Sequence, residues 1–242
     1  MATLTNTTIP TNNALLQRLS EGDRARLAPD LARVSMAMRQ PIEVANQSID
    51  EVYFPERGIV SVVAKAPDGR QIEAGVIGRE GMTGIAVVMG NHRSPNDAFI
   101  QVPGEAQRIS ADALRAALAY SPEMRAIFKR FVQVFMAQIA HTALANGRAK
   151  IEERLARWLL MAQDRLNGVS IELTHELIAL MLGVRRPGVT DALNALEGRG
   201  LIRSTRGAIR VIDRDGLIAS ANGYYGVPEA EYERLLGPLR NS

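Results

Sequence analysis

The stretch from residue 173 to residue 202 constrains the fold of this chain more than any other. It contains two short amphipathic helical patterns separated by three residues. Thr174 is a suitable N-cap for the first helix, because its hydroxyl can accept a hydrogen bond from a free backbone N–H. Gly183 follows that helix, and glycine readily adopts the left-handed conformation that a sharp turn needs. Pro187 falls in the first turn of the second helix, where a missing N–H costs little.

Three small or apolar positions indicate how the two helices meet. Ala179 allows close approach, Gly183 makes the turn, and Val189 fills the angle between the helices. This is the pattern of a helix-turn-helix, although any helical hairpin also uses a glycine and regularly spaced leucines. The outer face of the second helix then carries side chains of the types that contact base edges and phosphates. They are Arg185, Arg186, Thr190, Asp191 and Asn194.

A basic hairpin is predicted directly after the second helix. Two short β-prone runs flank Arg206 and Gly207 within residues 203–213, which is a compact hairpin signal. Between Gly198 and Ile212 the chain has four arginines and no acidic residue. They are Arg199, Arg203, Arg206 and Arg210. A lone run of charge is usually a solvated face. Next to a helix-turn-helix it favours a wing whose cations lie along a phosphate strand, so we predict binding to double-stranded DNA.

Composition limits the other classes of function. The 242 residues leave room for two modest domains or one large one, and the 46% hydrophobic content favours a packed core over disorder. The 29 Lys and Arg barely exceed the 26 Asp and Glu, so the local arginine cluster carries the nucleic-acid argument. The absence of cysteine from the sequence excludes disulfides, cysteine-bound metals and thiol catalysis. Because the sequence has no membrane-spanning run and no signal pattern, we expect a cytoplasmic protein without a membrane partner. We also expect no cofactor.

The N-terminal half shows a different periodicity. Short β-prone runs between residues 34 and 109 are separated by prolines and glycines. These runs lie at 42–44, 49–54, 58–64, 71–77 and 98–102. The turn from Ala66 to Gly69 predicts a hairpin between the third and fourth runs. Many short strands at this spacing predict an antiparallel β-roll, or jelly roll, over residues 14–121. Residues 1–13 are rich in Thr and Asn, and we expect a disordered tail there.

A long apolar helix is predicted over residues 122–146. Its apolar residues cover more than one stripe, so it must bury a second side on another surface. The simplest such surface is the same helix of a second subunit, and the alternative is a central helix in a monomer core. The predicted homodimer contacts are Ile127, Phe128, Phe131, Phe135 and Ile139. Asn146 and Gly147 are expected to end the helix. Residues 147–220 then form the DNA-binding domain and residues 221–242 a C-terminal extension of unassigned role, which makes the fold class α+β.

This order of parts resembles the Crp/Fnr family of bacterial transcription regulators. The match rests on IEERLARWLL at residues 151–160, on the stretch described first and on the arginine wing. The resemblance implies a regulator that acts as a homodimer on a palindromic operator, with RNA polymerase as a further partner. The family often has glutamate and arginine where this chain has Pro187 and Asp191, so its operator should differ. The predicted DNA contacts are Thr174, Arg185, Arg186, Pro187, Thr190, Asp191, Arg203, Arg206 and Arg210.

The β-roll departs from the family pattern for cyclic nucleotides. Members that bind them use a Gly-Glu pair for the ribose hydroxyl and, further along, an Arg-Ser pair for the phosphate. If Gly84 matches that glycine, Ile85 stands where the glutamate belongs, and Arg93 and Ser94 lie one residue early. We therefore predict that cyclic AMP is not an effector. Backbone N–H groups at Gly81 and Gly84 can bind another anion. The candidate effector contacts are therefore Gly81, Gly84, Arg93 and Ser94. Turns of the barrel explain the same glycines.

Other readings of the β-roll stay open. It can bind a different small effector or an unorthodox nucleotide, or no ligand at all. A jelly-roll metalloenzyme would need clustered histidines and carboxylates, and His92 is the only histidine between residues 34 and 109. With His141 and His175 also far apart in the sequence, we predict neither a metal or haem site nor an enzyme.

Overall fold

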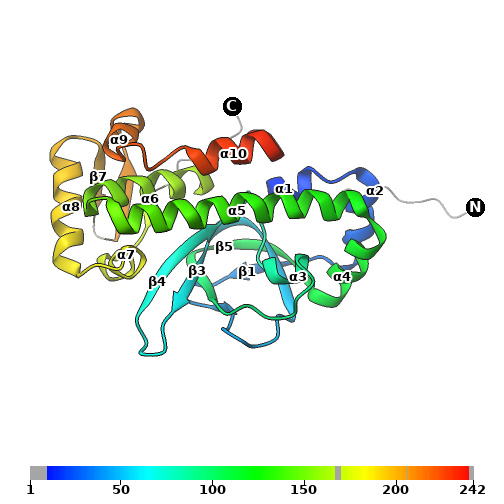
Figure 1. The fold of residues 1–242 in the computed structure, drawn as a ribbon. Helices are drawn as coiled ribbons and strands as arrows, with labels where there is room; N and C mark the ends of the chain where they lie inside the picture. Colours follow the sequence, from blue (N-terminus) through cyan, green and yellow to red (C-terminus); the bar gives the residue numbers. More distant parts are fainter. Residues whose placement is uncertain (1–9, 167–169, 206, 240–242) are drawn as a thin grey trace, which may run out of the picture.

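An antiparallel sheet forms the N-terminal half of the chain. The computed structural model describes residues 10–166, 170–205 and 207–239. The strand order is β1-β5-β3-β4, and β2 also pairs with β5 (Figure 1). The strands are β1 (Ala32–Met36), β2 (Pro41–Glu43), β3 (Glu51–Lys65), β4 (Gln71–Ile77) and β5 (Asp97–Ser110). The predicted hairpin is confirmed: β3 pairs with β4 across a turn in which Gly69 has a φ of +86°.

Strand β3 passes through Pro55 without ending, where the sequence predicted two separate strands. The pairing of β3 with β5 shifts register at three places between Pro55 and Val60. Proline cannot donate to the ladder, so a strand tolerates it where the pairing is irregular. Gly58 has a φ of +87°, and a side chain there would collide with the carbonyls of Val102 and Pro103. These bulges bend one long strand into the wall of a roll.

Asn13 immediately precedes the first helix and is fully buried. Its Oδ1 caps α1, and its Nδ2 donates to the carbonyls of Pro55 and Gly81, both at 2.8 Å. The prediction of a tail over residues 1–13 is therefore wrong at its end, because Asn13 supplies hydrogen bonds to strand β3 and to the loop that contains Gly81. Residues 1–9 lie outside the described residues. The short helices that follow are α1 (Ala14–Gln17), α2 (Glu21–Leu27) and the 3₁₀ turn Ala28–Asp30.

Two helices follow the sheet, α4 (Ala111–Tyr120) and α5 (Pro122–Arg148). The side chains of Ser110 and Ser121 cap them, as serine commonly does. The predicted break at Asn146-Gly147 is wrong, because α5 continues through both residues to Arg148. A glycine inside a helix costs only about 1 kcal/mol relative to alanine, and here it does not end the helix.

The three phenylalanines of α5 lie inside the protomer. Phe128, Phe131 and Phe135 are at most 4% exposed. Glycines on the sheet side make room for them: Gly81 lies against the ring of Phe131, and Gly75 against that of Phe135. The prediction that these three residues form the dimer contact is therefore corrected. Their rings fill the core between α5 and the β-roll.

The C-terminal half is a second unit, and its apolar core also includes Ile59, Val76 and Val102 of the β-roll. Its small sheet has the order β6-β8-β7. The elements are α6 (Ile151–Leu166), β6 (Ile171–Glu172), α7 (His175–Leu182), α8 (Arg186–Gly198), β7 (Ile202–Thr205), β8 (Ala208–Val211) and α9 (Arg214–Ser220). Figure 1 shows α8 on the outer side of this unit, away from the β-roll. Within the described residues, the helices lack the combined length and apolarity needed to cross a bilayer.

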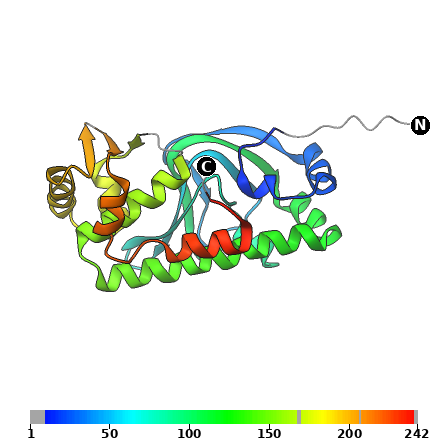
Figure 2. The same ribbon diagram turned by 90° about the horizontal axis from the view of Figure 1, so that it is seen from above.

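The last helix, α10 (Val227–Leu236), returns to the β-roll. Figure 2 shows it running alongside α5. Tyr232 is 1% exposed and belongs to the N-terminal core. Its hydroxyl donates to the carbonyl of Glu80, and Arg79 donates to the carbonyl of Leu239. The end of the chain thus helps to complete the first domain.

Candidate nucleic-acid interface

The turn between α7 and α8 has the geometry that its sequence predicts. Thr174 caps α7, accepting from the N–H of Leu177 at 3.2 Å. Gly183 ends α7 in the left-handed region with a φ of +59°. Val189 is fully buried between the helices, and Pro187 lies in the first turn of α8. The helix-turn-helix prediction is confirmed down to these local signals.

The outer face of α8 presents the predicted reading residues to solvent. Arg185, Arg186, Pro187 and Asp191 are exposed, and Thr190 is half-buried. All of them lie in the N-terminal half of α8 or just before it. The N-terminal part of a recognition helix is the part that reaches base edges in the major groove.

Two of these side chains are contacted by the first turn of α7. Arg186 lies 3.5 Å from the carboxylate of Glu176, measured from Nη1 to Oε1. The hydroxyl of Thr190 lies 3.2 Å from Nδ1 of His175. Sequence reasoning missed both contacts. The sequence of the first turn of α7 does not indicate that its side chains face the start of α8, because their direction depends on the angle between the two helices.

The wing is a two-stranded hairpin with a concentrated positive charge. Arg203 on β7 pairs directly with Arg210 on β8, and both side chains are exposed. Like charges directly opposite in a sheet destabilise it, and a phosphate strand beside them would relieve that cost. Arg199, which precedes the wing, forms an ion pair with Glu152, with Nη1 and Oε1 2.6 Å apart. Arg206, predicted at the wing tip, lies outside the described residues.

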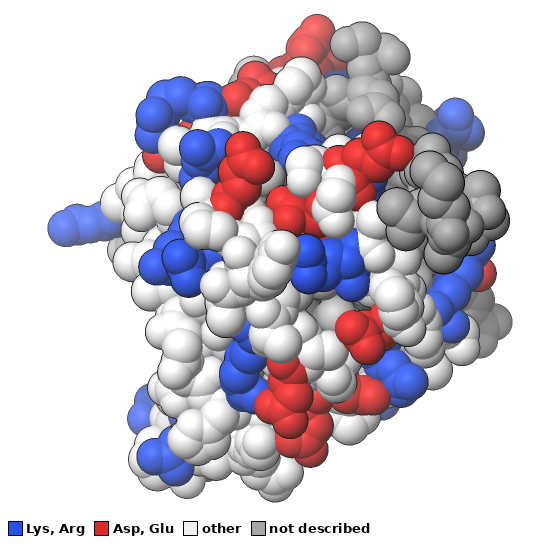
Figure 3. All heavy atoms as spheres, turned by 90° about the vertical axis from the view of Figure 1, so that its right-hand side faces the viewer, with Lys and Arg blue, Asp and Glu red and all other residues white. Residues whose placement is uncertain are grey.

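The opposite end of the molecule lacks such a concentration of charge. Figure 3 shows Lys and Arg interspersed with Asp and Glu on this face. Mixed charge of this kind is ordinary for a soluble surface. The coloured part of this face therefore shows no run of like charge that could follow a nucleic-acid backbone.

The candidate effector contacts in the β-roll are partly occupied by the protein itself. The N–H of Gly81 donates to the carbonyl of Gly78. The N–H of Gly84, which precedes the short helix α3 (Ile85–Val88), donates to Oε1 of Glu43 at 2.7 Å. Burial raises the pKa of the Glu43 carboxyl, and the Gly84 N–H opposes that shift. The carboxylate of Glu43, 41 residues away in the sequence, therefore accepts from one of the two predicted N–H donors.

The remaining predicted contacts are spread along a loop. Arg93 is exposed and Ser94 is half-buried. The Oγ of Ser94 accepts a hydrogen bond from the backbone N–H of Asn96. The backbone carbonyl of Ser94 accepts one from the backbone N–H of Asn46. Within the parts of the chain that the structure describes, no group of three histidines, cysteines or carboxylates could hold a metal ion.

Two family models match the chain. The cyclic nucleotide-binding domain matches residues 33–121, and the Crp-like helix-turn-helix domain matches residues 153–220. The transcriptional regulator LdrP of Thermus thermophilus is 27% identical over 197 residues, which cover 73% of this chain and 90% of the relative. The CRP-like cAMP-activated global transcriptional regulator of Mycobacterium tuberculosis is 25% identical over 209 residues, covering 81% and 91%.

Solved structures share the fold. FixK2 from Bradyrhizobium japonicum superposes with a TM-score of 0.68 at 18% identity, covering 78% of this chain and 96% of its own. A CRP/FNR-family transcriptional regulator from Thermus thermophilus gives a TM-score of 0.63 at 20% identity, covering 80% and 100%. Together with the two family models and the helix-turn-helix geometry, these likenesses show that the chain belongs to the Crp/Fnr family of transcriptional regulators, with a C-terminal DNA-binding domain.

Proposed function

We propose that this regulator acts in the cytoplasm as a homodimer, binds a palindromic operator and does not respond to cyclic AMP. The observation that carries the DNA-binding part is the exposed first turn of α8, with Arg185 and Arg186 beside the basic wing. Two such helices in a dimer would enter successive major grooves, roughly 34 Å apart along the duplex. Contact with RNA polymerase is a further part of this proposal and rests on the family resemblance.

An exposed apolar stripe on the C-terminal part of α5 supports the homodimer. Met136 and Leu144 are large hydrophobic residues that are 59% and 49% exposed. The residues between and beside them on this face are small, which allows two helices to approach closely. They are Ala140, Ala143 and Gly147, all exposed. The predicted contacts Ile127 and Ile139 are half-buried and pack against the protomer's own core.

Two features argue against cyclic AMP as the effector. Ile85 offers no carboxylate to a ribose hydroxyl, and an unpaired buried hydroxyl costs about 1–3 kcal/mol. Glu43 already accepts from the Gly84 N–H, so a phosphate there would meet a carboxylate. The Mycobacterium tuberculosis relative is cAMP-activated, and a structural neighbour from Xanthomonas campestris is c-di-GMP responsive. Effectors thus differ between proteins of this fold, and a different small effector is the alternative for this chain.

Selection from a randomised DNA library tests the proposed function. The full-length protein should enrich a two-fold symmetric sequence and sediment as a dimer on it. Enrichment of no sequence above background would contradict sequence-specific binding, and enrichment of a single half-site would contradict the homodimer. Calorimetry with cyclic AMP tests the effector claim, which micromolar or tighter binding would overturn.

A further inference from the structure

A carboxylate is buried where the β-roll meets the DNA-binding domain. Glu73 lies on β4 and is 4% exposed. Two of its hydrogen-bond donors come from the β-roll: the hydroxyl of Ser61 at 2.5 Å and Nε2 of Gln101 at 2.9 Å. The third donor is the indole Nε1 of Trp158 at 2.8 Å. Trp158 belongs to α6, so this hydrogen bond joins the two domains.

Helices α6 and α7 cover this carboxylate. A cavity of about 20 Å³ beside it is lined by Trp158 and Arg157 from α6 and by Met181 from α7. The nearby end of α7 also packs on the sheet, where Gly183 lies against Ile72. Movement of α6 and α7 away from β4 would therefore bring water to Glu73.

The charges that face Glu73 come from α6. Arg157 and Arg154 line the cavity, and Arg157 acts on the carboxylate through its charge. Burial lowers the pKa of Arg157, the charge of Glu229 on α10 raises it, and the charge of Arg165 lowers it. The residues that line the cavity from α5 and α7 are uncharged; they are Thr142, Ala145, Asn146, Met181 and Leu182.

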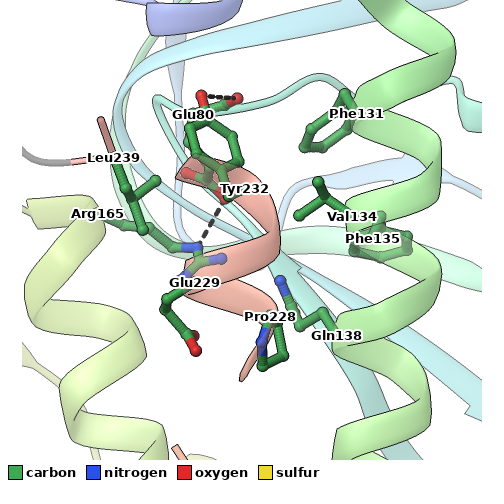
Figure 4. Close-up of a pocket in the computed structure, with 10 residues that line it drawn as sticks. All are labelled: Glu80, Phe131, Val134, Phe135, Gln138, Arg165, Pro228, Glu229, Tyr232 and Leu239. Carbon is green, nitrogen blue, oxygen red and sulfur yellow. Dashed lines mark hydrogen bonds and ion pairs between the residues drawn. The ribbon is translucent and has the colours of Figure 1, made fainter. Parts of the chain in front are cut away.

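A second buried carboxylate provides a contrast. Glu80 accepts from Nε of Arg165 at 2.8 Å, and both side chains are at most 4% exposed (Figure 4). Its charge is compensated by a direct ion pair. Glu73 instead has three uncharged hydrogen-bond donors. A proton would neutralise Glu73 without breaking a direct ion pair, and Arg157 would still interact with the charge of Glu229.

We propose that Glu73 is a proton-binding site that couples the β-roll to the DNA-binding domain. Its protonated form favours the docked arrangement in which α6 and α7 cover β4, and its ionised form weakens that arrangement. Any effect on operator binding rests on the function proposed above, whereas the docking does not.

The direction of the effect follows from burial. Burial raises the pKa of Glu73 from 4.5 to about 7, although the bonds from Ser61, Trp158 and Gln101 and the charge of Arg157 lower it. The docked state thus holds the proton more tightly than an undocked state in which water reaches the carboxylate. The equilibrium constant for docking is therefore highest below pH 4.5. It falls about tenfold for each pH unit above 4.5 and becomes constant again above about pH 7.

The only tryptophan of the sequence is the reporter. Fluorescence of Trp158 in the full-length protein, titrated from about pH 5 to about pH 9 to bracket this pKa, should change with a midpoint near 7. The neutral, isosteric variant Glu73→Gln should lose this transition. The exposed Glu172→Gln should keep it, as should separate His→Gln changes at His92, His141 and His175. Loss of the transition in a histidine variant, or its retention in Glu73→Gln, would overturn the proposal.

A second measurement does not depend on the folding of Glu73→Gln. Carbon-13 carboxyl NMR of glutamate-labelled protein should show one carboxyl that titrates near pH 7. Trp158→Phe removes a donor to the ionised form and should move this midpoint to higher pH. An unchanged midpoint would show that the interdomain hydrogen bond plays no part. Operator binding should depend on pH between 6 and 8, within about one unit of the midpoint, only when Glu73 is present. Failure to bind any operator would refute the proposed function alone.

Discussion

Arg186 and Arg210 are exposed arginines of one DNA-binding domain for which we predict two different roles. Arg186 begins α8, where side chains reach base edges, whereas Arg210 stands on the wing opposite Arg203. A bidentate contact between arginine and guanine discriminates by about 1–3 kcal/mol. A phosphate contact carries no sequence information and depends on salt. The same residue type is therefore expected to give different phenotypes at the two positions.

Arg186→Ala should relax the base preference at one position of each half-site, which titrations of single-base operator variants would detect. Arg210→Ala should weaken all sequences alike and lower the salt dependence by about one unit per lost phosphate contact. Arg115→Ala on α4, where Arg115 pairs with Asp112, is the matched control and should change neither. A uniform loss of affinity in Arg186→Ala, with the base preferences intact, would contradict its reading role.

The hydrogen bonds of Asn13 lead to a prediction about stability. Asn13→Ala leaves the carbonyls of Pro55 and Gly81 without their donor and removes the cap of α1. Each unsatisfied buried group costs about 1–3 kcal/mol, so we expect the free energy of unfolding in urea to fall by about 2–4 kcal/mol. Gln17→Ala, at an exposed position nearby, should cost less than about 0.5 kcal/mol. Equal losses for the two variants would show that Asn13 has no special part.

At the scale of the element, α5 divides its apolar residues between two faces. Phe131 lies inside the protomer, and Met136 lies on the exposed stripe. Met136→Glu should therefore give a folded monomer by sedimentation with weaker operator binding. Phe131→Glu buries a charge in a packed core and should lower the melting temperature of the protomer itself. A Met136→Glu protein that remains a dimer would place the interface elsewhere.

Elements with local signals were predictable from the sequence, and those held by distant contacts were not. Thr174, Gly183 and Pro187 act within one turn of their own positions, so the helix-turn-helix could be placed from the amino-acid order alone. Pro55 suggested a break because the bulges that accommodate it depend on pairing with β5. The side of α5 that Phe131 occupies depends on Gly81, and Glu43 meets Gly84 from 41 residues away. No pattern within a single segment encodes such contacts.

At the scale of the whole molecule, α10 connects parts that the sequence keeps far apart. Figure 4 shows Tyr232 beside Glu80, Arg165 and Phe131, among residues from α5, α6 and the β-roll. Arg18 near the N-terminus donates to the carbonyl of Pro238 at 2.9 Å and lies over the ring of Tyr232. The C-terminal extension therefore contributes to the structure of both domains.

Replacement of Tyr232 measures this contribution. Tyr232→Ala should cost about 3–5 kcal/mol, the usual loss for an aromatic residue removed from a core. Tyr232→Phe keeps the ring and loses only the bond to the Glu80 carbonyl, a loss of about 1 kcal/mol. Chemical denaturation followed by circular dichroism would separate the two. A small loss in Tyr232→Ala would mean that α10 rests on the surface without supporting it.

The position of Tyr232 also determines when the first domain can be finished during synthesis. Its ring, with Leu236 and Leu239, belongs to the core that Leu15 and Phe54 begin. A ribosome makes the β-roll first, yet that core lacks these three side chains until α10 and Leu239 emerge. Contacts across so many residues slow folding, and exposed apolar surface invites aggregation meanwhile. The nascent N-terminal domain should therefore need chaperone protection until residues 232–239 have left the ribosome, unlike a domain whose core is complete within its own sequence.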